Sequence, residues 1–179
     1  ILLHMKVWIL NHYATDMYFD GGGRHHSLAK YLIKLGHDVK IFCANTEHNS
    51  SRMVDTEGML YTERIGKDNV PYIFIKTRPY EGNGKDRILN MVDYYIGVKK
   101  VMRIYVKQYG SPDIFYASSV HPLALIAGIK ARHKYGGLSI CEVRDLWPET
   151  LVELGMIRRK SIVARLMYYG EKWIYKKAD

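Results

Sequence analysis

The sequence predicts an α/β fold of the Rossmann-like class, in which helices cover both faces of a parallel sheet. Short apolar runs typical of buried strands alternate with longer segments whose apolar residues recur at helical spacing. Glycine-rich turns separate several of these segments. The chain has 179 residues, 47% of them hydrophobic, which is enough for one domain to bury a sizeable core.

The first expected unit consists of a strand, a turn, a helix and a second strand. Residues 6–10 (KVWIL) form a short apolar run that predicts a buried strand. After a Gly-rich turn at 20–23, leucines recur at helical spacing in residues 24–35, which predicts a helix. Gly36 can adopt the left-handed conformation that ends a helix. Residues 39–43 (VKIFC) predict the next strand. Because such crossovers are right-handed, this order predicts a parallel βαβ unit.

A polar segment separates this unit from the rest of the chain. Residues 45–69 lack periodicity, which predicts a mobile active-site loop, with a small hairpin as the alternative. The elements expected after it are a strand at 72–76, a helix at 85–107, a strand at 114–117, a helix at 122–134, a strand at 138–143 and an amphipathic helix at 161–177. Ligands of such sheets bind beyond the carboxyl ends of the strands.

Composition indicates the cellular location, the state of the cysteines and the charge of the partners. No apolar run approaches the ~20 residues of a membrane-spanning helix, and the N-terminal residues lack the basic region, apolar core and cleavage site of a signal peptide. We therefore expect a cytoplasmic protein. Residues 1–4 are interpreted as an expression remnant or an upstream start. Cys43 and Cys141 lie in strand-like runs and are expected to be reduced core residues. The net charge of +9 favours an anionic partner without choosing among phosphate, lipid and nucleic acid.

The first polar cluster is the glycine loop formed by Gly21, Gly22 and Gly23, followed by Arg24. Glycines let backbone N–H groups approach a phosphate, and the N-terminus of the helix that follows favours negative charge. We therefore expect an anionic ligand here, with a mere flexible turn as the alternative. The G-x-G-x-x-G and G-x-x-x-x-G-K-[ST] spacings are absent, which argues against NAD and ATP.

A second cluster follows the fourth predicted strand and contains Ser118, Ser119 and His121. His121 is a candidate donor to a ligand hydroxyl or phosphate, while helix capping by Ser119 beside an incidental histidine is the alternative. His25 and His26 are adjacent and should diverge on a helix. No spacing of His, Cys or Asp in the sequence resembles a zinc or iron site, so no metal is expected.

The most specific signal is the segment 142–149 (EVRDLWPE), in which a strand ends and a turn starts the next helix. Arg144 can pair with phosphate or carboxylate, Asp145 can accept from sugar hydroxyls, and Trp147 offers a flat face for stacking. Glu149 closes the segment. The alternative is a structural Arg144–Asp145 ion pair with Trp147 in the core.

Three stretches together resemble the N-terminal domain of the retaining glycosyltransferases of family 4, which have the two-domain GT-B fold. The likeness is greatest to enzymes of O-antigen and capsule synthesis that transfer N-acetylated sugars such as N-acetyl-fucosamine. It covers residues 5–179 as the acceptor-side domain, cut before its last strand, and implies a missing C-terminal domain that binds the donor. The stretches are GGGRHHSLAKYLIKLGHDV (21–39), SSVHPLALIAG (118–128) and EVRDLWPETLVELG (142–155).

The resemblance also implies a reaction and residues for it. The donor is a nucleoside-diphosphate sugar, such as a UDP-sugar, whose diphosphate lies beside the glycine loop 21–23 and Arg24. Retention of the anomeric configuration is implied, with neither a metal nor a cofactor. His121, Arg144 and Asp145 are the residues expected to act in the transfer, with Ser118 as the alternative to His121. Arg144-Asp145 stand where many relatives have His-Asp.

The acceptor implied by the resemblance is a glycan linked to polyprenyl diphosphate. The acceptor-side residues are expected to be Ser118, Ser119, Trp147 and Glu149. The family's E-x7-E carboxylates belong to the missing domain, so the fragment alone is expected to be inactive.

Basic and aromatic residues near the end of the chain predict docking on an anionic inner membrane, with a solvated helix face as the alternative. They are Arg158, Arg159, Lys160, Arg165, Tyr168, Tyr169, Lys172, Trp173, Lys176 and Lys177.

Two other functions are weighed against transfer. A stand-alone dinucleotide-using dehydrogenase or epimerase lacks support because the third glycine and an acidic residue after the second strand are missing. A nucleic-acid-binding module would suit the net charge, but no recognition motif occurs in the sequence, and nucleic acid is not an expected partner.

Overall fold

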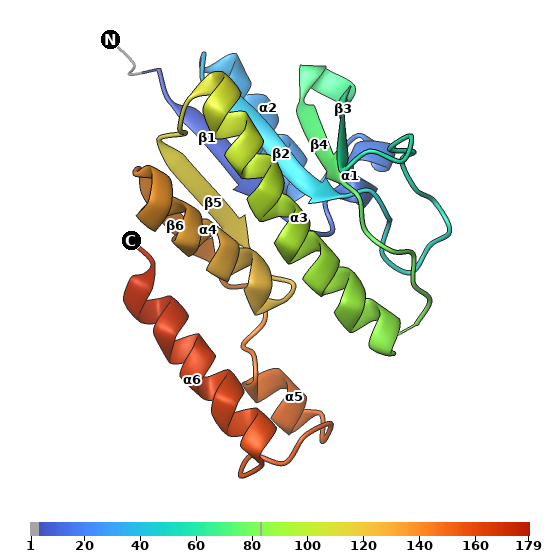
Figure 1. Ribbon diagram of the computed structural model, residues 1–179, viewed down its shortest axis with the longest axis vertical. Coiled ribbons are helices and arrows are strands. Elements are labelled where there is room, and N and C mark those ends of the chain that lie inside the picture. The colour runs from blue at the N-terminus through green and yellow to red at the C-terminus, as the bar shows by residue number, and fades with distance from the viewer. Residues whose placement is uncertain (1–3, 83) are drawn as a thin grey trace.

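The computed structural model describes residues 4–82 and 84–179, and its centre is a six-stranded sheet with the order β3-β4-β2-β1-β5-β6 (Figure 1). Four of the five neighbouring pairs are parallel, and β3 runs antiparallel to β4. This arrangement confirms the Rossmann-like α/β class. The strands are β1 (Lys6–Leu10), β2 (Asp38–Ala44), β3 (Tyr61–Ile65), β4 (Pro71–Ile75), β5 (Ile114–Ser118) and β6 (Leu138–Glu142).

Helices cover both faces of the sheet, as the sequence predicts. In Figure 1, α3 and α4 lie in front of the sheet and α2 lies behind it. Alternate residues of β1 supply the two cores, because successive strand side chains point to opposite faces. Trp8 packs with α3 and α4, whereas Ile9 packs with Ala29 of α2. The helices are α1 (Thr15–Asp20), α2 (Arg24–Lys34), α3 (Lys85–Tyr109), α4 (Pro122–Tyr135), α5 (Glu149–Glu153) and α6 (Ile162–Lys177), with a 3-10 turn η1 (Lys67–Asn69).

One difference from the sequence prediction is α1, which lies between β1 and the glycine loop. The loop therefore does not follow the first strand directly. The helix is only 6 residues long, too short to show a periodic apolar face. Its position is fixed by tertiary contacts: the Thr15 hydroxyl donates to the Ala44 carbonyl at 2.6 Å, at the end of β2.

A second difference is β3, which lies inside the segment 45–69. The preferred prediction of a mobile loop was wrong for residues 61–65, and the hairpin alternative was right. Thr62 pairs with Phe74 of β4 in antiparallel register. The strand is hard to recognise because it is an edge strand whose sequence, YTERI, carries charged residues.

The order of the strands creates a switch point between β1 and β5. From β1 the chain adds β2 and then β4 on one side, after which α3 leads across to β5 on the other side. Loops leaving the carboxyl ends of such strands diverge to opposite faces, which leaves room for a ligand between them. Here the residues that follow β1 and β5 are 11–13 and 119–121.

The last helix, α6, packs against α4. Ser161 caps it by accepting from the Ala164 N–H at 3.2 Å, and Ile174 is buried in the core formed with α3 and α4. At the edge strand β6, the Asp179 N–H donates to the Ser139 carbonyl at 3.1 Å. None of the described helices has the length and apolar character needed to span a membrane.

The two cysteines lie in strands. Cys43 is buried in β2 and Cys141 is half-buried in β6, and both are free thiols. Burial raises the pKa of both thiols above the usual value, so both stay protonated at neutral pH.

Candidate functional site

Glu142 links the glycine-loop helix to the end of β5. It is the last residue of β6, and its Oε2 accepts from Ser118 Oγ at 2.6 Å and lies 2.9 Å from His25 Nε2. Its Oε1 pairs with the Arg24 guanidinium. Burial raises the pKa of Glu142, but hydrogen bonds from Ser118, Arg24 and His25 together lower it below the usual value. Glu142 is therefore an ionised carboxylate with three donors around it.

The protonation of His25 follows from its neighbours. The Tyr13 N–H donates to Asn11 Oδ1 at 3.2 Å, so the amide nitrogen of Asn11 is the atom 2.9 Å from His25 Nδ1. Since that nitrogen can only donate, Nδ1 accepts, and the ring proton sits on Nε2 facing Glu142. Burial lowers the pKa of His25 although Glu142 opposes this, so the ring is neutral at pH 7.

The glycine loop makes a tight turn between α1 and α2. Gly21 and Gly23 have φ of 62° and 101°, in the region that favours glycine. A Cβ at Gly21 would lie 2.8 Å from Lys67 Cδ, whereas a Cβ at Gly22 would meet no atom within 4 Å. Gly21 and Gly23 therefore serve the backbone conformation, and Gly22 leaves open surface.

Two arginines surround the start of α2. No side chain of the described residues caps α2, so its first-turn N–H groups remain available to an anion. Arg24 pairs with Glu142 but keeps 65% of its side chain exposed. Arg24 and Arg144 both contribute to the lowered pKa of His25, after burial. Arg24, Arg144 and Glu142 thus gather where the loop meets β6. Acidic groups lie nearby as well, because burial and then the charge of Asp20 raise the pKa of Asp16, and the charge of Arg144 lowers it.

His121 contacts His12 across the switch point. His12 Nδ1 lies 2.6 Å from His121 Nε2, and the His12 ring stacks on Tyr94 with centroids 4.5 Å apart. Burial lowers the pKa of His121 to about 3, with the charge of Arg87 adding to the shift. His121 Nδ1 is buried and meets no hydrogen-bond partner in the part of the chain that the structure describes. The ring is therefore a neutral group with one buried nitrogen that lacks a partner among the described residues.

Ser119 holds the segment after β6 instead of capping α4. Its hydroxyl accepts from the Arg144 N–H at 2.9 Å, and its own N–H donates to the Glu142 carbonyl at 2.9 Å. The residue at the N-cap of α4 is His121, and no side chain in the described ranges caps that helix. The capping alternative for Ser119 was therefore wrong.

Asp145 and Trp147 lie beside a small pocket between α4 and α6. With Ser119 they line about 100 Å³. The salt bridges found among the described residues do not include Arg144 with Asp145, and both side chains are exposed. The structural ion pair considered for them is thus not formed. The rest of the pocket lining includes the apolar residues Leu125, Ile126, Val143, Met167, Ile174 and Tyr175.

Glu149 lies outside the group around Glu142. It accepts from the Tyr168 hydroxyl of α6 at 2.5 Å and pairs with Arg159 in the α5–α6 connection, which fastens α5 to both. Hydrogen bonding from Tyr168 lowers the pKa of Glu149, followed by the charge of Arg159. The structure thus gives this carboxylate partners within the α5–α6 unit.

Four residues of this site were given no role in ligand binding from the sequence: Asn11, His12, His25 and Glu142, although Glu142 opens the segment 142–149. The strand-end rule could have found three of them, because Asn11 and His12 follow β1 and Glu142 ends β6. His25 was considered only as a metal ligand. The structure describes no group of three or more His, Cys, Asp or Glu side chains that could hold a metal ion.

Comparison with known proteins adds no relative to these observations. No family model matches the chain, and no curated protein matches it.

Proposed function

We propose that the chain is the acceptor-side domain of a retaining glycosyltransferase. The enzyme moves a sugar, N-acetylated in the subgroup that the sequence resembles, from a nucleoside-diphosphate sugar to a lipid-linked glycan. One observation carries the proposal: the carboxylate of Glu142 joins residues of all three stretches on which the resemblance rests. It binds Arg24 and His25 from the first stretch and Ser118 from the second. Segments 118 residues apart in sequence thus meet at one carboxylate.

In this proposal the donor diphosphate lies at the start of α2. The first-turn N–H groups of that helix, together with Arg24 and Arg144, favour the negative charge that grows on a departing diphosphate. Gly22 lets the ligand approach, because the space where its side chain would be is open. Further contacts to the donor sugar and base come from a second domain, as the resemblance implies.

The acceptor in this proposal approaches from the side of Ser119, Asp145 and Trp147. Asp145 is exposed and can accept from a sugar hydroxyl, while Trp147 offers an aromatic face. His121 lies deeper, with its Nδ1 buried and without a hydrogen-bond partner among the described residues. Because its pKa is lowered to about 3, His121 would act as a neutral hydrogen-bonding group and not as a cation.

Two observations speak against a dinucleotide-using enzyme. Helix α1 separates β1 from the glycine loop, whereas a dinucleotide site needs the loop directly between strand and helix. The first carboxylate after β2 belongs to Glu47, which is buried. Its Oε2 accepts from Arg52 Nε at 2.7 Å. Glu47 is thus already engaged and cannot serve as the free acid that binds a ribose.

Sugar transfer by the full gene product tests the proposal. Labelled N-acetylated nucleoside-diphosphate sugars are offered with polyprenyl-diphosphate-linked acceptors, and the Gly22→Trp variant is compared with Gly84→Trp. Both glycines have open space at the Cβ position and neither has a positive φ, so both variants should fold. We expect Gly22→Trp alone to abolish transfer. An active Gly22→Trp variant, or no transfer from any nucleotide sugar, would reject the proposal.

A further inference from the structure

Part of the apolar surface of α6 faces solvent. Ile162, Leu166 and Tyr169 are 77%, 67% and 72% exposed. Their spacing of four and three residues places them on one face of the helix. The helix packs on the rest of the molecule through its other side, where Ala164 and Ile174 are buried. The outward stripe is therefore not needed to hold α6 in place.

The exposed apolar surface extends beyond the helix to the α5–α6 connection. Leu154 and Met156 are 69% and 66% exposed, and Val163 is 57% exposed. Glu149 holds α5 against α6 through Tyr168 and Arg159, so these residues belong to one unit. Single exposed apolar residues are ordinary, but a cluster of them marks a site of interaction. We call Leu154, Met156, Ile162, Val163, Leu166 and Tyr169 the α5–α6 apolar surface.

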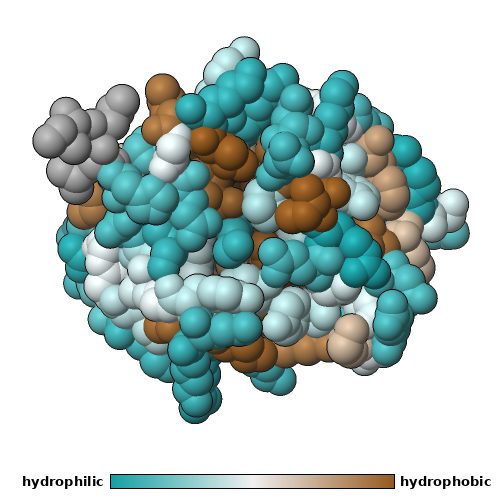
Figure 2. All heavy atoms as spheres, turned by 90° about the horizontal axis from the view of Figure 1, so that it is seen from above, coloured by the Kyte–Doolittle hydropathy of each residue, from teal (hydrophilic) through white to brown (hydrophobic). Residues whose placement is uncertain are grey.

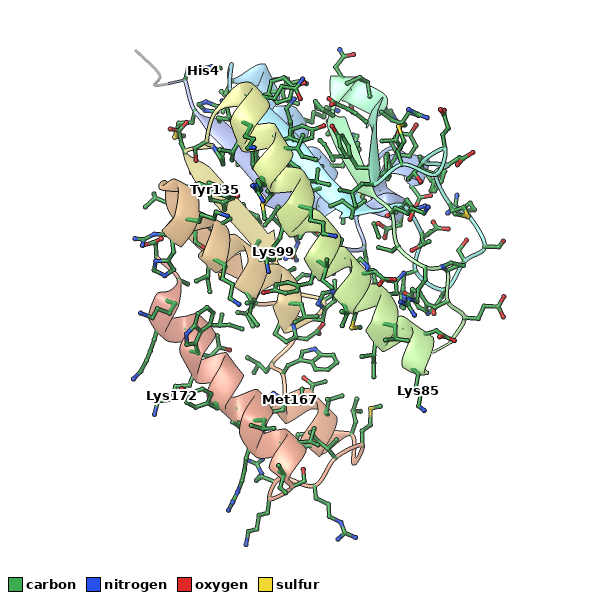
Figure 3. The ribbon with its side chains drawn as sticks, viewed as in Figure 1. His4, Lys85, Lys99, Tyr135, Met167 and Lys172 are labelled. Carbon is green, nitrogen blue, oxygen red and sulfur yellow. The ribbon has the colours of Figure 1, made fainter. Side chains whose placement is uncertain are left out.

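Basic residues surround this surface. Arg165, Lys172 and Lys176 lie at helical spacing along one side of the stripe. Figure 3 shows Met167 on the side of α6 toward the molecule and Lys172 pointing away from it. Six basic residues of this part of the chain form no salt bridge with a described residue. They are Arg158, Lys160, Arg165, Lys172, Lys176 and Lys177.

The acidic residues of the same unit leave this positive charge largely uncompensated. Glu149 and Glu153 pair with Arg159, and Asp179 pairs with Arg132 of α4. Glu171 is the acidic residue within α6, where it accepts from the Tyr175 hydroxyl at 3.0 Å. Apolar side chains ringed by cations are typical of helices that lie at the boundary between headgroups and acyl chains. A second copy of the chain fits less well, because it would bring the same cations face to face.

We propose that the α5–α6 apolar surface docks on the anionic face of a lipid bilayer. Leu166 and its neighbours enter the headgroup boundary, while Arg165, Lys172 and Lys176 contact lipid phosphates. In Figure 1, α5 and the start of α6 project on the side of the sheet where the strands have their carboxyl ends. Docking there brings the region of Glu142 and His121 close to the membrane. The docking surface does not rest on the proposed sugar transfer and is tested without it.

The opposite end of the molecule is less suited to a bilayer. Figure 2 looks onto that end, where hydrophilic residues cover most of the surface and hydrophobic ones show as separate patches. The apolar stripe of α6 beside the cations is therefore the better candidate for the docking face.

Vesicle flotation tests the proposal with the chain and two matched triple variants. The first is Arg165→Gln with Lys172→Gln and Lys176→Gln. The second removes the same charge from exposed positions of α3, by Lys100→Gln with Arg103→Gln and Lys107→Gln. We expect binding to vesicles of phosphatidylcholine with phosphatidylglycerol, and none to phosphatidylcholine alone. At about five-fold per basic residue, the α6 triple should bind about 100-fold more weakly, and the α3 triple nearly as well as wild type.

A third variant tests the apolar part of the surface. Ile162→Ser with Leu166→Ser should weaken binding to the anionic vesicles without changing the melting temperature, because both side chains are exposed. Failure of the chain to bind anionic vesicles would overturn the proposal, as would equal losses in the two charge triples. Unchanged vesicle binding by the Ser variant would also overturn it. If that variant instead dissociated a dimer in analytical ultracentrifugation, the partner would be a second copy.

Discussion

Replacing Glu142 with alanine should destabilise the whole domain, because its carboxylate is the common acceptor of three donors. Ser118 and the His25 side chain are fully buried, and each loses its acceptor at a cost of about 1–3 kcal/mol. The Arg24 pair adds less than about 1 kcal/mol, since the arginine side chain is 65% exposed. Because Glu142 itself is 17% exposed and water can enter, we expect a loss of about 2–4 kcal/mol.

Urea unfolding at pH 7, followed by circular dichroism, measures this loss. Glu153→Ala is the control, because Glu153 is also a carboxylate but is 71% exposed, and its removal should cost less than about 0.5 kcal/mol. A loss below about 1 kcal/mol for Glu142→Ala would refute the proposed network.

A double-mutant cycle separates the network from a general loss of packing. Ser118→Ala in the wild type removes a hydrogen bond to a charged acceptor and should cost about 1.5–3 kcal/mol. In the Glu142→Ala background the same substitution removes a donor that already lacks its partner, so it should cost almost nothing. Additive losses would show that Ser118 and Glu142 do not interact.

Three further outcomes follow from other contacts. Burial lowers the pKa of His121 from 6.5 to about 3, so below pH 6.5 the unfolded chain binds a proton that the native state does not, and the free energy of unfolding should fall. His121→Gln should make this fall less steep in urea titrations between pH 7 and 5. An unchanged slope would contradict the assignment. Gly21→Val should lower the melting temperature, because φ at Gly21 is 62° and the new Cβ would lie 2.8 Å from Lys67 Cδ. Gly22→Val should leave the melting temperature unchanged. A larger decrease for Gly22→Val than for Gly21→Val would contradict the loop geometry. Gly97→Ala places a Cβ 2.4 Å from Ile75 Cγ2 and should lower the free energy of unfolding in urea by about 1–3 kcal/mol. An unchanged free energy of unfolding would contradict the close packing of α3 on β4.

The main elements of the fold follow from the sequence because apolar runs and helical spacing are local signals. β1, β2, β4, β5 and β6 all occur where short apolar runs predict them, with ends that differ by at most one residue. The two elements that were missed depend on contacts distant in sequence. α1 is held by Ala44 and β3 by β4, so neither carries enough signal alone.

The site was predicted only in outline. The rule that polar groups gather at the carboxyl ends of strands applies to the clusters at 118–121 and 142–149, whereas the glycine loop follows α1 and not a strand. The rule could not pair Arg24 and His25 with Glu142, because those contacts depend on how α2 lies against β6. The expected divergence of His25 and His26 is confirmed: His25 faces Glu142, while His26 Nδ1 lies 2.8 Å from the Tyr72 hydroxyl.

The chain from Asn11 through His25 to Glu142 offers a spectroscopic reporter inside the site. One backbone N–H, that of Tyr13, orients the Asn11 amide and thereby decides which nitrogen of His25 carries the proton. That proton is shielded from solvent and shared with a carboxylate, so its NMR signal should be shifted downfield and exchange slowly with water. Any ligand that draws Arg24 or Ser118 away from Glu142 changes this signal before it changes the fold. The resonance of His25 therefore tests the proposed binding of a ligand at the glycine loop without measuring turnover.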